Sequence, residues 1–197
     1  MHLFIDTYLQ VFFVLTPFAV LSAYLALTRN RDRRAQTQLA WRVTGAVMVI
    51  VLCLYGAGQY IFAVYGVTLD AFRVGAGVLL FLSAIGLVQG KGGLEAHTRP
   101  DEDVAVVPLA MPIMVGPATT GILLVMGSTP TPMTERLLTA GAMLCAVLTV
   151  CSLLLLAAPI ERRLGAVGIS ILSKLTGLML TAMAAQIIAT GVKGLMR

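Results

Sequence analysis

The stretch PLAMPIMVGPATTGILLVMGS, residues 108–128, combines an apolar composition suited to a membrane with prolines at positions 108, 112 and 117. Proline removes a backbone donor and clashes with the preceding turn, so it breaks or kinks a helix. Lipid cannot satisfy the carbonyls that such a break frees, and irregular backbone at membrane depth survives only inside protein or beside a water-filled cavity. The stretch therefore predicts a broken membrane helix placed where a transport site would be built.

A helix that restarts after Pro117 would present its first free N–H groups as a partly positive pocket that suits a carboxylate. Gly116 and Gly121 would let the backbone come close to a ligand or a neighbour, and Thr119 and Thr120 supply hydroxyls just after the break. The alternative is a proline kink packed among other helices, with the threonines bonding back to their own backbone. Both interpretations stay open at the level of this stretch.

The composition of the whole chain is that of a multi-pass membrane protein. Of its 197 residues, 58% are hydrophobic and only 12% are charged, and the mean hydropathy is +0.93; soluble domains carry charge on about a quarter of their residues. A helix needs about 20 apolar residues to cross the hydrocarbon. Six low-charge runs meet that length, at 8–27, 43–65, 72–90, 104–128, 137–159 and 168–191. We therefore expect an all-α membrane protein with six transmembrane helices and no soluble domain.

The basic residues indicate topology rather than nucleic-acid binding, because they sit in short loops beside the spans instead of forming one large face. Clusters follow the first, third and fifth spans: Arg29, Arg31, Arg33, Arg34 and Arg42, then Lys91 and Arg99, then Arg162 and Arg163. The positive-inside rule makes those loops cytoplasmic. Both termini are then expected to face outward, and the N-terminal tail lacks the basic segment of a cleaved signal peptide.

The sequence offers no constellation for catalysis or for a metal. Cys53, Cys145 and Cys151 lie within apolar runs without metal-ligand spacing, and His2 and His97 sit in a tail and a loop. No Ser–His, Cys–His or paired carboxylate arrangement falls within the spans. We expect neither an enzyme nor a resident cofactor.

Polar residues inside the spans are few, which makes each a candidate. The first span carries Thr16-Pro17 near its middle and so resembles the fourth span with its Gly116-Pro117. Gln59 in the second span and Lys174 and Gln186 in the sixth are further candidates for lining a path. A glutamine can equally bond a neighbouring helix, and Lys174 can snorkel to the interface.

A weak internal repeat relates the two halves of the chain. At an offset of 101 the third span aligns with the sixth, pairing Arg73 with Lys174, and at an offset of 100 Pro17 aligns with Pro117. Residues 1–90 and 104–197 then form two three-helix repeats, joined by a cytoplasmic connector at 91–103. Because each repeat crosses the membrane an odd number of times, the second inserts upside down, as in many secondary transporters.

Three segments carry a resemblance to a known family: VPLAMPIMVGP at 107–117, FRVGAGVLLFLSAIGLVQG at 72–90 and KLTGLMLTAMAAQ at 174–186. On these the chain resembles the MarC family, also called the SnatA-type neutral amino acid transporter family and grouped with the LysE-type exporters. The resemblance implies a six-helix bacterial inner-membrane protein and, from the few characterised relatives, uptake or export of glycine, alanine and similar solutes. The chain departs from the family at Thr16, where asparagine is usual, and at Ala19 and Ala118, where glycine is usual, so substrate identity does not carry over directly.

The resulting hypothesis is a secondary transporter of small neutral amino acids in which the two broken helices meet at mid-membrane. The carboxylate would sit near Thr119 and Thr120, and the ammonium would face carbonyls released by Pro17 and Pro117, with Thr16 nearby. No acidic residue lies in mid-span, so coupling would rely on Na⁺ held by carbonyls, on H⁺ by another route, or on uncoupled efflux. The alternatives are a channel, an intramembrane enzyme, and a non-transporting membrane protein of MarC type.

Overall fold

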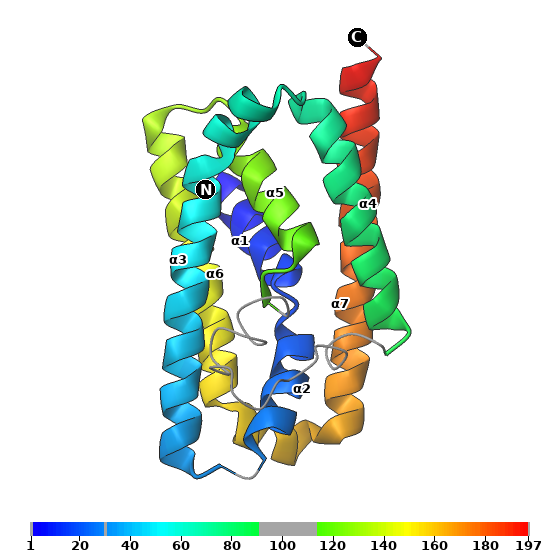
Figure 1. Cartoon of the computed structure of the whole chain (residues 1–197). Helices are drawn as coiled ribbons and strands as arrows, with labels where there is room; N and C mark the ends of the chain where they lie inside the picture. Colours follow the sequence, from blue (N-terminus) through cyan, green and yellow to red (C-terminus); the bar gives the residue numbers. More distant parts are fainter. Residues whose placement is uncertain (1, 30, 91–113, 197) are drawn as a thin grey trace.

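The computed structural model describes residues 2–29, 31–90 and 114–196. Within these ranges the protein is an all-α bundle, as predicted, in which two pairs of long helices flank three shorter ones (Figure 1). The seven helices of the described residues are α1 (His2–Val14), α2 (Pro17–Thr28), α3 (Arg33–Tyr65), α4 (Leu69–Val88), α5 (Pro117–Ser128), α6 (Met133–Leu155) and α7 (Ala157–Leu195).

Five apolar segments are long enough to cross a membrane: His2–Thr28, Arg33–Gly58, Leu69–Val88, Met133–Leu155 and Ala157–Leu195. They confirm the prediction of a multi-pass membrane protein. The fourth predicted span, 104–128, is represented by α5, whose 12 residues reach only about 18 Å of a hydrocarbon core about 30 Å thick. Its first part, 104–113 with Pro108 and Pro112, lies outside the described residues, as does the predicted connector 91–103.

The last predicted span, 168–191, lies within α7. The chain turns at Leu156, and α7 then runs through a segment carrying Glu161, Arg162 and Arg163 before it bends at Gly165 (φ 66°, ψ 173°), a conformation that only glycine adopts readily. Two helical segments meet at this bend, and the second one, which contains the predicted span, begins directly after Gly165. The first segment carries the charged residues that a hydropathy pattern leaves out of a span.

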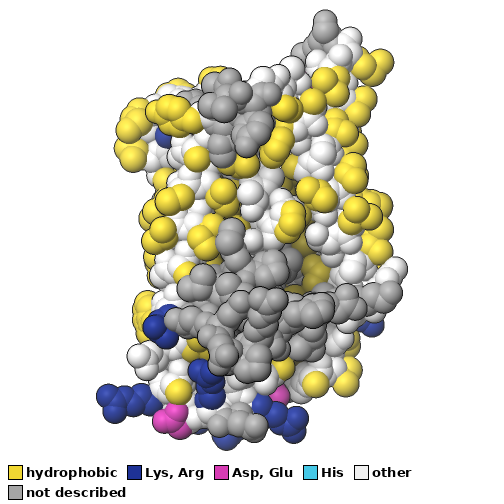
Figure 2. Space-filling view, viewed as in Figure 1, with side chains coloured by type: hydrophobic (Ala, Val, Ile, Leu, Met, Phe, Trp, Pro, Cys, Tyr) yellow, Lys and Arg dark blue, Asp and Glu magenta, His cyan; other side chains and the backbone are white. Residues whose placement is uncertain are grey.

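The two ends of the bundle differ in charge. The start of α1 and the end of α7 lie toward one end, here called the outer end, and the α2–α3 and α6–α7 junctions lie at the opposite, inner end (Figure 1). Lysine and arginine side chains gather at the inner end (Figure 2). The basic residues of the two inner junctions are Arg29, Arg31, Arg33, Arg34, Arg162 and Arg163. The described basic residues beside these junctions thus make the inner end the basic end of the bundle.

Helices α4 and α7 pack along each other through small residues in a reciprocal pattern. A Cβ on Gly177 would lie 2.9 Å from the carbonyl oxygen of Ala84, and one on Gly77 would lie 3.3 Å from that of Ala184. The two contacts are equivalent at an offset of 100, because Gly77 then corresponds to Gly177 and Ala84 to Ala184. The sequence alignment of these two helices favoured an offset of 101. Small residues at such contacts let membrane helices approach closely.

Candidate solute site

The first span leaves helical geometry between Val14 and Pro17. Thr16 adopts a left-handed conformation (φ 48°, ψ 56°), the only non-glycine residue with positive φ among those described. Its N–H donates to the carbonyl of Phe13 at 2.9 Å, and its own carbonyl accepts from Val20 at 3.0 Å. Thr16 thus ends α1 and starts α2 in one residue, and Pro17 takes the first helical position, where its missing N–H costs nothing.

The second interruption precedes α5. Gly116 is extended (φ −84°, ψ −178°), Pro117 opens the helix, and the N–H of Thr120 donates to the Gly116 carbonyl at 2.9 Å. Thr120 is half-buried. Gly121 on the next turn is buried against α4, where an added Cβ would lie 2.6 Å from the Cβ of Ala76. The sequence therefore needs glycine at 121 for close helix packing.

Thr119 connects the two interruptions. Its hydroxyl oxygen lies 3.3 Å from the carbonyl oxygens of both Val14 and Met114, and its side chain is 5% exposed. The single hydroxyl hydrogen is therefore shared between the last turn of α1 and the residues before α5. Of the predicted site residues, Thr119 thus contacts the end of α1 at Val14, two residues before Thr16, and its hydroxyl bonds backbone carbonyls.

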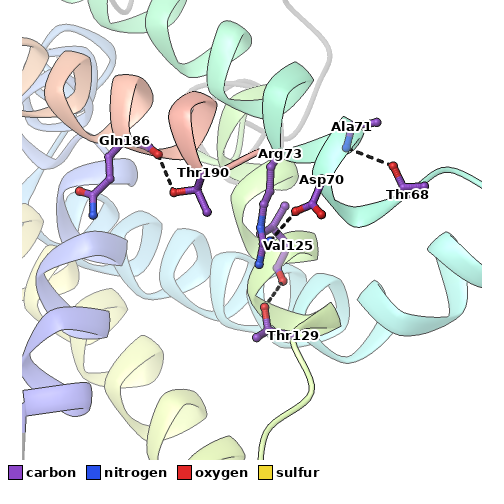
Figure 3. A network of polar contacts seen from close by, with 8 residues as sticks. All are labelled: Thr68, Asp70, Ala71, Arg73, Val125, Thr129, Gln186 and Thr190. Carbon is purple, nitrogen blue, oxygen red and sulfur yellow. Dashed lines mark hydrogen bonds and ion pairs between the residues drawn. The ribbon is translucent and has the colours of Figure 1, made fainter. Parts of the chain in front are cut away.

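A cavity of about 580 Å³ lies in the outer half of the bundle, between α1, α4, α5 and α7. Arg73 extends from α4 toward α5, where Val125 lies, while Gln186 and Thr190 stand on the neighbouring α7 (Figure 3). The lining residues are Asp6, Leu9, Gln10, Phe13, Arg73, Ile122, Val125, Met126, Met179, Met183, Gln186, Ile187 and Thr190. The cavity thus combines an apolar wall with a few polar groups, as solute sites commonly do.

The predicted site residues divide between the cavity and the helix interruptions. Gln186 lies in the cavity wall, whereas the residues predicted around the two prolines do not line it. The lining residues that come nearest in sequence to the interruptions are Phe13, directly before Val14, and Ile122, more than one helical turn after Pro117. Lys174 is exposed on α7 away from the cavity, and the Gln59 side chain lies outside what the structure describes.

Sequence reasoning missed Asp6, Gln10 and Arg73, which it treated as edges of spans or left aside. A helical spacing was the signal: positions 6, 10 and 13 fall on one face of α1, and 179, 183, 186 and 190 on one face of α7. These faces line the cavity. The polar residues on these two faces, Asp6, Gln10, Gln186 and Thr190, therefore line the cavity, although the two helices are otherwise mostly apolar.

Arg73 is held by an ion pair at the start of α4. Its Nη1 lies 2.7 Å from Oδ1 of Asp70, with the two side chains 23% and 31% exposed. Thr68 caps the same helix end by accepting the N–H of Ala71 at 3.2 Å. Asp70 also packs under α7, where a Cβ on Gly191 would lie 2.7 Å from the Asp70 carbonyl oxygen and one on Gly194 would collide with its carboxylate. The arginine is therefore anchored at the mouth of the cavity.

This fold defines a multi-pass, all-helical integral membrane protein with a solute-sized cavity between helices of both halves. Residues 1–196 match the MarC family of integral membrane proteins, so the chain belongs to that family, which confirms the resemblance seen in the sequence.

Full-length relatives are widespread. A UPF0056 membrane protein of Aquifex aeolicus is 29% identical, covering 99% of this chain and 94% of its own length. One of Methanocaldococcus jannaschii is 28% identical, with 97% and 96% covered, and the UPF0056 membrane protein YhcE of Escherichia coli is 24% identical, with 95% and 91% covered. No solved structure matches the chain.

Proposed function

We infer that this protein is a secondary transporter of small neutral amino acids, of the glycine and alanine class, working by alternating access in the inner membrane. One observation carries the inference: α1 and α5, which each adjoin a proline-linked helix interruption, one in each half of the chain, also line one cavity in the outer half of the bundle. Discontinuous helices in corresponding positions of two repeats are where secondary transporters bind their solutes.

The helix bounds support an inverted repeat of three helices with the first and fourth broken at proline. Adding 100 to α2, Pro17–Thr28, gives the bounds of α5, Pro117–Ser128. The packing agrees with this repeat, in which α2 corresponds to α5, α3 to α6 and α4 to α7. Helix α2 contacts α7, and its counterpart α5 contacts α4. Helices α3 and α6 contact each other, and so do α4 and α7, as counterparts related by a two-fold axis can. In the bundle α2 descends from the middle and α5 ascends (Figure 1), which is the relation expected of two units inverted about an axis across the bundle.

The interruptions offer groups for both charges of a small amino acid. The start of α5 favours a carboxylate through its free N–H groups and the hydroxyls of Thr119 and Thr120. The carbonyl of Val14, now engaged by Thr119, would take the ammonium once the two interruptions separate. Ala118 and Gly121 are buried beside this point, and they leave room for only a small side chain.

The test is flux and counterflow of labelled glycine and alanine in proteoliposomes, with and without Na⁺ and pH gradients. We expect saturable exchange that Thr119→Val reduces strongly and Thr120→Val reduces less. Thr129→Val is the matched control, because that hydroxyl only bonds the Val125 carbonyl within its own helix end, at 3.0 Å. The gradient that drives accumulation identifies the coupling ion.

The same measurement separates the alternatives. Flux that rises linearly with concentration, without counterflow, would favour a channel lined by the same interruptions. A folded protein that moves neither amino acid would overturn the substrate class and favour a non-transporting membrane protein.

A further inference from the structure

We propose that the outer cavity is itself a binding site for zwitterions, in which the Arg73 guanidinium takes the carboxylate and the Asp6 carboxylate takes the ammonium. The proposal rests on the inferred transport function and deepens it, because it places solute recognition at two residues outside the helix interruptions. It also extends the solutes recognised beyond glycine and alanine.

The charges of the cavity are arranged as opposites on separate walls. Asp6 on α1 and Arg73 on α4 are the two charged residues among those that line it. In the described parts of the chain they form no salt bridge with each other, since Arg73 pairs with Asp70 instead. Two opposite charges that face one cavity from different helices complement the two charges of an amino acid.

Arg73 keeps donors free for a ligand. A guanidinium has five N–H groups in a fixed fork, and the Asp70 contact uses Nη1. Over residues 2–29, 31–90 and 114–196, neither Nε nor Nη2 has a protein acceptor. The remaining edge matches the paired oxygens of a carboxylate. Asp70 is a positioning residue, because its packing under Gly191 and Gly194 keeps the guanidinium at the cavity.

The rest of the wall fits an apolar side chain. Met126, Met179 and Met183 line it from α5 and α7, together with Phe13, and methionine adapts to irregular shapes. A cavity of about 580 Å³ lies within the usual range for solute sites, about 300 to 1,000 Å³. We therefore assign to this site amino acids with apolar side chains up to the size of leucine, while the interruptions select by size for passage.

Binding to the purified full-length protein in nanodiscs, measured by calorimetry, tests the proposal with four probes. These are glycine, leucine, propionate, which lacks the ammonium, and propylamine, which lacks the carboxylate. We expect both amino acids to bind, and propionate and propylamine, which each keep one of the two charges, to bind more weakly.

The variants assign each charge. Arg73→Gln should weaken binding of both amino acids and propionate by roughly tenfold to a hundredfold, the loss expected for a charged hydrogen-bond partner, and Arg73→Lys should restore part of it. Asp6→Asn should weaken glycine and leucine but leave propionate unchanged, a split that a merely structural role would not produce. Arg136→Gln is the matched control, since this outer-end arginine contacts the Gly127 carbonyl at 3.4 Å and does not line the cavity.

Three results would overturn the proposal: a wild type that binds none of the probes, a folded Arg73→Gln protein with unchanged affinities, or an Asp6→Asn protein that loses propionate as well. If Arg73→Gln and Asp6→Asn both transport amino acids at the wild-type rate and with the wild-type KM, this binding site is ruled out while the transport function stands. Charge-selective binding without any flux would support this binding site and overturn the transport function.

Discussion

At the scale of single residues, Thr16 holds the most strained backbone that the described residues contain. It is β-branched and yet adopts φ 48°, a conformation that costs such residues on the order of 1–3 kcal/mol and that asparagine tolerates better. We predict that Thr16→Asn raises the free energy of unfolding by about 1 kcal/mol, while Thr16→Val does not. Thermal unfolding in detergent measures both. Equal destabilisation by the two variants would show that the backbone conformation does not limit stability here.

Single residues also show which features could be predicted from the sequence and which could not. Pro17 and Pro117 predict breaks from the sequence because a missing N–H is a local property, and α2 and α5 begin at those residues. Asp6 and Arg73 looked like span edges because their role depends on α1, α4, α5 and α7 surrounding one cavity. That arrangement is a property of helix packing, which no single span encodes.

At the scale of elements, α5 packs closely against α4 because residue 121 is a glycine and has no side chain. A Cβ at Gly121 would lie 2.6 Å from the Cβ of Ala76 and 3.3 Å from its Cα, so Gly121→Val must push the helices apart. We predict a loss of about 1–3 kcal/mol, the usual cost of overpacking, seen as a lower unfolding temperature. Gly75→Val is the control, since a Cβ there meets nothing within 4 Å.

The double variant Gly121→Val with Ala76→Gly refines this prediction. If the helix contact is the cause, removing the facing methyl should recover part of the lost stability, and the two changes should be non-additive. Additive losses would place the effect of Gly121→Val elsewhere.

The elements also show why the repeat was hard to align. Spans rich in leucine, alanine and glycine match almost as well after a slip of one residue, so composition could not separate an offset of 100 from 101. The packing favours an offset of 100 for the proposed repeat. At that offset Leu80 pairs with Leu180, both buried, and Gly77 pairs with Gly177, which make reciprocal contacts. An offset of 101 would pair the exposed Leu79 with the buried Leu180.

At the scale of the whole molecule, the proposed repeat predicts a second conformation. The cavity of this structure lies in the outer half of the bundle and is lined by Val125 and Met183, among others. If the two halves exchange conformations, the positions 100 residues earlier, Leu25 and Ser83, should line the matching cavity at the inner end. The same shift takes Ile122 to Ser22. A solute that binds between the halves would then face either end in turn.

Single cysteines placed at these positions, in a protein whose three native cysteines are replaced, test the exchange. A thiol reacts as its thiolate, so labelling by a membrane-impermeant reagent reports contact with water. During turnover with a saturating solute on the outer side, labelling of Val125→Cys and Met183→Cys from the outer side should fall. Labelling of Leu25→Cys and Ser83→Cys from the inner side should rise under the same conditions. The two sets must move in opposite directions because one opening closes as the other forms; a parallel change, or an inner set that never reacts, would rule out alternation between repeats.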